Sequence, residues 1–109
     1  MMSRLKKAVD QLVHDEYALA SEQYGPKHNT PHEAYAVMKE ELEEAQHEVD
    51  TVDDKLNIEY WRGVMYDSDL TCTHNAKEIR DHAIKAACEM IQVAAMAEKT
   101  LKGYGRDEK

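Results

Sequence analysis

The sequence predicts an all-α protein, built as a four-helix bundle-like domain. Its composition favours helix, because 109 residues include only 4 glycines and 2 prolines. Apolar residues recur at spacings of three and four over several long stretches, which is helical periodicity. No stretch alternates between apolar and polar residues over the length of a strand. We therefore expect residues 1–109 to form a single domain, with a frayed tail over residues 103–109.

The first helix is expected from about residue 3 to residue 24. Apolar residues follow helical spacing from Leu5 to Tyr24. Gly25 suits the position that follows a helix end, and Pro26 cannot continue the helix. A short connection over residues 27–29 should follow.

The second helix is expected to begin after Thr30 and to reach about residue 54. Thr30 as N-cap, Pro31 as first helical residue and Glu33 form a capping box with a favourable first-turn proline. The apolar face of this helix comprises Ala34, Met38, Leu42, Ala45, Val49 and Val52. A third, shorter helix to about residue 66 should follow an acidic patch, unless the two form one bent helix.

The last helix is expected from about Asn75 to Lys102, after a loop with capping residues at 67–69. Between Ala83 and Ala97 it is nearly apolar all round, so we expect burial on most sides, with Cys88 as a small core residue. One small chain offers too few partners to cover this helix. The excess of apolar surface therefore predicts a homo-oligomer, either a dimer or a tetramer.

Charge and hydropathy restrict the partners. The formal net charge of −8 argues against a nucleic-acid backbone or an anionic membrane surface. No apolar run is long enough for a membrane span or a signal peptide, so neither is expected. The two cysteines should be reduced thiols in a cytoplasmic protein.

A row of glutamates borders the apolar face of the second helix. With Met38 at zero and 100° per residue, Glu41 and Glu48 fall about 60–80° to one side and Glu44 about 120° to the same side. Glu40 points outward. Carboxylates gathered at a core boundary repel one another unless a cation lies between them. The row is either a solvated acidic face or a divalent metal site with oxygen ligands.

The last helix carries a second polar stripe in its apolar stretch. Lys85, Glu89 and Gln92 are spaced i, i+4, i+7 and therefore share one face, with His82 near it. Either Glu89 pairs with Lys85 on a solvated strip, or the stripe lies opposite the glutamates of the second helix and forms a polar pocket. Periodicity alone does not choose between these alternatives.

Two short motifs at these places resemble a known family. Glu40-Glu41-Leu42-Glu43-Glu44 matches E-E-x-x-E, and Glu89-Met90-Ile91-Gln92 matches E-x-x-D with Gln92 in the Asp position. Over roughly residues 24–101 the chain resembles the MazG-like, all-α nucleoside triphosphate pyrophosphohydrolases of bacteria and their phages.

The resemblance implies cleavage of a nucleoside triphosphate between its α- and β-phosphates, giving a monophosphate and pyrophosphate. It implies Mg²⁺, with Mn²⁺ as an alternative, held by the catalytic carboxylates Glu41, Glu44 and Glu89 with Gln92 alongside. Carboxylate oxygens and substrate phosphates are the ligands that Mg²⁺ prefers. From its position, Lys85 is a candidate phosphate contact. Trp61 is either a core residue or the ring on which a base stacks.

Other functions stay open. Gln92 offers one neutral oxygen where the family has a carboxylate, so the chain is alternatively a catalytically degenerate member or a helical interaction scaffold. A di-iron carboxylate bundle uses two E-x-x-H motifs. This chain has one, from Glu44 to His47, and His47 projects away from the apolar row.

Overall fold

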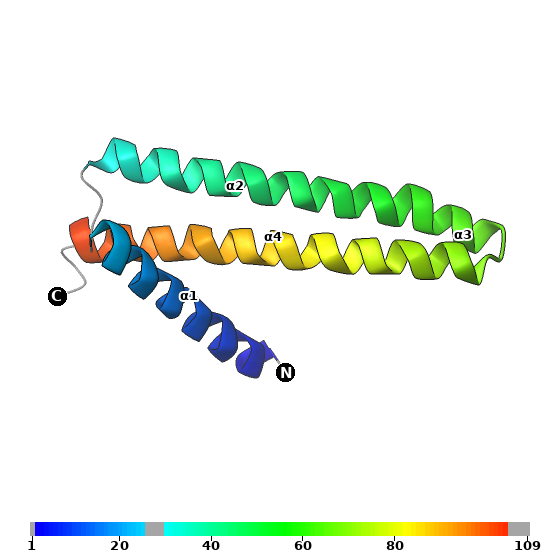
Figure 1. Ribbon diagram of the computed structural model, residues 1–109, viewed down its shortest axis with the longest axis horizontal. Coiled ribbons are helices and arrows are strands. Elements are labelled where there is room, and N and C mark those ends of the chain that lie inside the picture. Colours follow the sequence, from blue (N-terminus) through cyan, green and yellow to red (C-terminus); the bar gives the residue numbers. More distant parts are fainter. Residues whose placement is uncertain (1, 26–29, 105–109) are drawn as a thin grey trace. The chain divides into compact units, whose positions relative to one another are not determined.

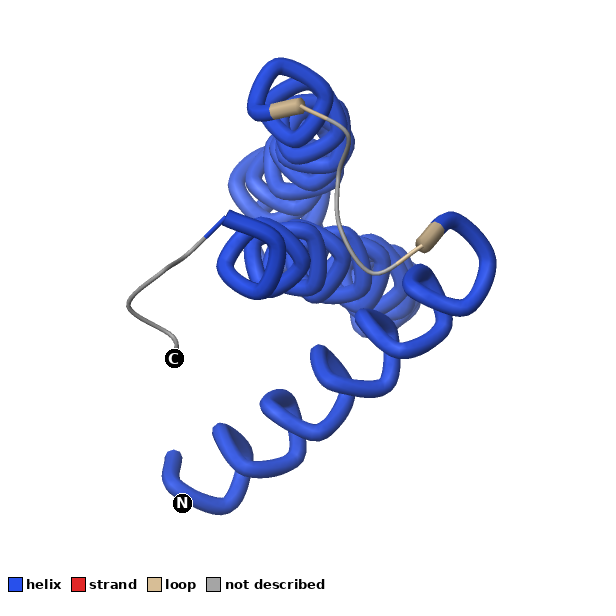
Figure 2. The backbone as a smooth tube through the Cα atoms, turned by 90° about the vertical axis from the view of Figure 1, so that its left-hand side faces the viewer, coloured by secondary structure: helices blue, strands red, loops and turns tan. Residues whose placement is uncertain are grey.

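The computed structural model describes residues 2–25 and 30–104, and within them it is helical with short turns and no strand (Figures 1 and 2). The elements are α1 (Met2–Tyr24), α2 (Pro31–Asp54), a π-helix (Lys55–Tyr60), α3 (Trp61–Met65) and α4 (Asp69–Tyr104). The predicted all-α class is confirmed. The chain divides into two compact units, one of Met1–Leu42 with Glu89–Lys109 and the other of Glu43–Cys88.

The end of α1 and the start of α2 follow the predicted signals. Gly25 has a φ of 92° and donates its backbone N–H to Ser21 O at 2.9 Å, a left-handed helix end that glycine adopts without strain. Thr30 Oγ1 accepts the backbone N–H of Glu33 at 3.0 Å, and Pro31 is the first helical residue. The predicted connection at residues 26–29 lies outside the described residues.

The predicted break near residue 54 is a change of helix type. Asp54 and Trp61 both have right-handed helical dihedrals on either side of the π-helix, so one helical run continues from Pro31 to Met65. The described residues thus contain three long helical runs, which agrees with the alternative of one bent helix after Thr30, while the four-helix bundle-like arrangement stays a prediction. After Pro31, no glycine or proline interrupts this run before Gly63. The departure from regular α-helix after Asp54 is therefore a short π-helix rather than a break in the chain.

The last helix begins six residues earlier than predicted, at Asp69. Ser68 is its N-cap: Ser68 Oγ accepts the backbone N–H of Thr71 at 3.2 Å, and Ser68 O accepts that of Cys72 at 3.0 Å. Asp67, with a φ of 52°, makes the turn before it. The helix extends to Tyr104, so the predicted end at Gly103 is slightly short, and residues 105–109 lie outside the described part.

Within the second unit, the α2–α3 run and α4 form an antiparallel hairpin. The chain reverses at Tyr66–Ser68, and Cys72 Sγ lies 4.0 Å from Tyr60 O near this turn. Farther along, His82 Nδ1 lies 2.6 Å from Glu48 Oε1. Residue numbers fall on α4 as they rise on α2, as antiparallel packing requires.

The Glu48–His82 pair makes the hairpin sensitive to acid. The hydrogen bond from His82 lowers the pKa of Glu48; desolvation opposes this shift, and the charges of His82, Lys85 and His47 add to it. A carboxyl whose folded pKa lies below its unfolded value stabilises the fold above the unfolded pKa, about 4.5. This contribution is lost as the pH falls through the folded pKa.

Replacing His82 with glutamine should therefore change how the melting temperature depends on pH in acidic solution. We expect the melting temperature of His82→Gln to lie below that of the wild type at pH 6 and the two to converge as the pH falls through the lowered pKa of Glu48. The control is His74→Gln, because His74 is exposed and lies 4.0 Å from Glu78. Parallel profiles for wild type and His82→Gln would contradict the assignment.

Few side chains are buried in the described part of the chain, and most of the buried apolar ones are alanines. The buried apolar residues are Ala34, Ala45, Ala86, Ala95 and Met96. No residue of α1 is buried, and large apolar residues such as Leu12, Leu56 and Ile84 are about half exposed. The predicted burial of the 83–97 stretch is not achieved within the chain, and Cys88 is exposed rather than in a core. The reason is that a helical hairpin covers only one side of each helix.

None of the described helices is both long enough and apolar enough to cross a membrane.

Candidate metal centre

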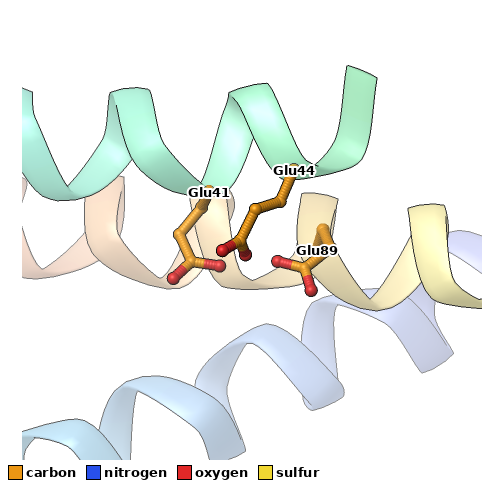
Figure 3. Close-up of side chains that lie close together, drawn as sticks. All are labelled: Glu41, Glu44 and Glu89. Atoms are coloured by element: carbon orange, nitrogen blue, oxygen red, sulfur yellow. The ribbon is translucent and has the colours of Figure 1, made fainter. Parts of the chain in front are cut away.

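Three glutamates from two helices converge on one point (Figure 3). One carboxylate oxygen each from Glu41, Glu44 and Glu89 lies within 4.8 Å of the others. Glu41 on α2 and Glu89 on α4 both belong to the first unit, and Glu44 follows one turn later on α2. Glu41 and Glu89 are half-buried, and Glu44 is exposed. The cluster therefore has an inner side and a side open to solvent.

Local sequence explains how each carboxylate is placed. Glu41 and Glu44 are three residues apart on one helix, so their side chains leave the same flank. In the second unit Ala45 and Ala86, directly after Glu44 and three residues before Glu89, are buried at 1% and 8% exposure. Such small side chains let the helix backbones approach closely. The reach of a glutamate side chain is then enough to bring the carboxylates together.

The donor set suits a hard divalent cation. Three carboxylates at this separation repel one another, and a bound cation would remove that repulsion. Mg²⁺ holds oxygen ligands at about 2.1 Å, so ligands on opposite sides of the ion lie about 4.2 Å apart. Oxygens within 4.8 Å of one another need only a small side-chain adjustment to reach that geometry. The cluster contains no histidine, and His47 of the di-iron alternative is not part of it.

Gln92 lies one turn along α4 from Glu89 and makes a contact of its own. Its amide Nε2 donates to Glu16 Oε2 of α1 at 2.9 Å, and both side chains are partly buried. The amide nitrogen is thus committed to Glu16, while Oε1 is the atom that a cation would use. This contact ties α1 to α4 within the first unit.

A cavity of about 560 Å³ lies in the first unit beside Glu41. Its size is typical of a small-molecule site. Its polar lining comes from all three long helices and its apolar lining from side chains of the same helices. The lining residues are Glu16, Leu19, Ala20, Gln23, Tyr24, Glu33, Val37, Glu41, Gln92, Met96 and Lys99.

The two predicted substrate contacts, Lys85 and Trp61, belong to the second unit. Lys85 is exposed, and its charge lowers the pKa of Glu48. Trp61 is 54% exposed rather than in a core, and it lines a hollow with Leu56 and Val64. Along the helical run at about 1.5 Å per residue, Trp61 is about 25 Å from Glu44. A ligand held by Glu44 would have to span that distance to touch Trp61 of the same chain.

The sequence predicted neither Glu16 nor Lys99 as a site residue, although both line the cavity. Glu16 interrupts the apolar face of the first helix, and nothing in its spacing connects it with Gln92. Lys99 did leave a signal, because it lies seven residues after Gln92 and thus extends the polar stripe by two turns. The predicted stripe of Lys85, Glu89 and Gln92 ends two turns before Lys99.

No protein-family model, curated protein or solved structure matches this chain.

Proposed function

We propose that this protein is a Mg²⁺-dependent nucleoside triphosphate pyrophosphohydrolase, with Mn²⁺ as an alternative metal. The observation that supports the proposal best is the convergence of Glu41, Glu44 and Glu89, whose oxygens lie within 4.8 Å of one another. These are the carboxylates of the two motifs that resemble the MazG-like family. The cavity beside Glu41 offers space for a substrate.

In the proposed reaction, water attacks the α-phosphorus, the bond between the α-phosphorus and the bridging oxygen breaks, and pyrophosphate leaves. A bound divalent cation would neutralise the triphosphate, which the acidic protein would otherwise repel, and would favour a nucleophilic water. Glu41 and Glu89, the half-buried pair, would hold the ion. Glu44, on the open side, would complete the ligand set and face the water. Gln92 would hold α4 against α1 on the cavity side of the cluster, through its hydrogen bond to Glu16.

The test is a screen for pyrophosphate release from canonical and damaged nucleoside triphosphates with Mg²⁺ and with Mn²⁺. We expect at least one substrate to yield equal amounts of monophosphate and pyrophosphate and none without metal. Release of inorganic phosphate alone, or no turnover with any nucleotide, would refute the proposal.

We also propose that the chain assembles into a homo-oligomer, a dimer or a tetramer, in which copies complete a four-helix bundle. Half-exposed apolar residues on every long helix support this, including Leu19, Val49 and Met90. A cytoplasmic setting, expected from the free thiols, belongs to the same proposal. Light scattering that reports only monomer at tens of micromolar would contradict the assembly.

The same exposed apolar surface favours a second function, a non-enzymatic interaction scaffold in which the glutamates are ordinary surface groups. The two functions differ in their response to metal. Binding of Mg²⁺ to the folded state alone must raise the free energy of unfolding by RT ln(1 + c/Kd), where c is the concentration of free Mg²⁺, and hence must raise the melting temperature. A scaffold would show no such rise with Mg²⁺ or Mn²⁺.

A further inference from the structure

A buried lysine faces the cavity of the first unit. Lys99 on α4 is only 5% exposed and lines the cavity together with Glu41 and Gln92. Over the described ranges 2–25 and 30–104, its ammonium group forms no hydrogen bond or ion pair. Its ammonium nitrogen is not among the buried side-chain atoms that lack a partner in the described part of the chain, so it still reaches the open space of the cavity. Lys99 therefore has hydrogen-bonding capacity that the chain itself does not use.

Glu16 and Glu41, two carboxylates of the cavity lining, do not bind the ammonium group of Lys99. Neither Glu16 nor Glu41 forms an ion pair with it, and Glu16 accepts its hydrogen bond from Gln92 at 2.9 Å. These carboxylates offset the lysine charge only at longer range. They also make the cavity acidic on balance, so an anion would be repelled unless it entered with a cation.

We infer that Lys99 is the anion-binding residue of this cavity and takes a phosphoryl group of a metal-bound polyphosphate. The inference rests on the proposed function, since Glu41 belongs both to the glutamate cluster and to the cavity wall. A polyphosphate has separate oxygens for a metal ion at the cluster and for the lysine. Leu19, Val37 and Met96 line the apolar part of the same cavity and leave room for the uncharged part of the ligand.

The arrangement predicts coupled binding. Metal at the cluster lowers the negative charge that a phosphate meets, so Mg²⁺ should raise the affinity for inorganic pyrophosphate. By linkage, pyrophosphate should raise the affinity for Mg²⁺ by the same factor. A hydrogen bond to a charged partner of this kind corresponds to about 10- to 100-fold in affinity.

The experiment is calorimetric titration of the full chain with Mg²⁺ alone and with pyrophosphate in the presence of Mg²⁺. Lys99→Met keeps the length of the side chain and removes its charge, and Lys99→Arg keeps the charge. The matched control is Lys102→Met, since Lys102 is an exposed lysine on the same helix that pairs with Glu98 at 3.4 Å. We expect Lys99→Met to weaken pyrophosphate binding about 10- to 100-fold without changing Mg²⁺ affinity, and Lys102→Met to change neither.

Equal losses in Lys99→Met and Lys102→Met would overturn the inference, because they would show only the effect of net charge. A wild type that binds Mg²⁺ but not pyrophosphate would overturn it while leaving the metal centre intact. Pyrophosphate binding that depends on Lys99 but not on Mg²⁺ would instead refute the proposed metal-dependent function and keep the anion site.

A second measurement needs no variant and covers the case in which Lys99→Met does not fold. Reductive methylation of the wild type, followed by mass spectrometry, reports the accessibility of each lysine. Pyrophosphate with Mg²⁺ should slow methylation of Lys99 several-fold and leave Lys102 unchanged. Equal rates at Lys99 with and without pyrophosphate would overturn the inference.

Discussion

Replacing Glu41 with glutamine is expected to abolish pyrophosphate release and to weaken Mg²⁺ binding by at least about 100-fold. Loss of even an indirect partner of a metal ligand typically costs about 10- to 100-fold, and Glu41 is proposed as a direct ligand. Glutamine preserves the shape of the side chain but removes the charge. Glu41 also lines the cavity, so the substitution acts where metal and substrate would meet.

The same substitution should leave the metal-free protein as stable as the wild type or slightly more stable. Three carboxylates with oxygens within 4.8 Å of one another repel, and removing one charge relieves that repulsion. Without metal, the melting temperature of Glu41→Gln should therefore equal or exceed that of the wild type. With Mg²⁺ the order should reverse, because only the wild type gains from binding.

Glu40→Gln is the matched control for this pair of measurements. Glu40 is the residue before Glu41 on α2, and its substitution removes the same charge. Its side chain is exposed and is not part of the cluster. We expect it to bind Mg²⁺ and to turn over substrate within about twofold of the wild type, since exposed charges contribute little. If Glu40→Gln and Glu41→Gln behave alike, the cluster is not a metal centre.

Gly63→Ala is expected to destabilise the protein by about 1–3 kcal/mol, the usual cost of overpacking. A Cβ at Gly63 would lie 2.8 Å from Cys72 Sγ and 3.1 Å from Cys72 N, and the backbone of α4 cannot yield as a flexible side chain would. In an open helix the same change would stabilise by about 1 kcal/mol. The sign of the effect therefore reports how closely α3 and α4 approach.

Thermal or urea unfolding measures this effect, and a double-mutant cycle locates its cause. Cys72→Ala removes the sulfur but not the backbone nitrogen, so Gly63→Ala/Cys72→Ala should recover part of the loss. The expected fall in melting temperature for Gly63→Ala is several degrees, at about 4–8 °C per kcal/mol for a domain of this size. A rise in melting temperature would show that the close approach is absent.

Helix ends and periodicity in this chain are encoded locally, and the sequence alone predicted them where the signals lay within a few residues. Thr30 caps α2 because its hydroxyl reaches the N–H of Glu33, and Gly25 ends α1 because it tolerates a positive φ. The common flank of Glu41 and Glu44 follows from the helical repeat. Where several residues could serve as the cap, as over residues 67–69, the local signal was ambiguous and the predicted start of α4 was wrong.

The tertiary structure alone decided which groups from different helices meet. Periodicity placed Glu89 on a polar stripe, but only the packing of α4 with α2 brings its carboxylate to Glu41. Burial of Lys99 and the bond between Gln92 and Glu16 likewise depend on the approach of α1. The physical reason is that hydrogen bonds within a helix join residues four apart, whereas burial and charge pairing depend on distances that the three-dimensional packing sets.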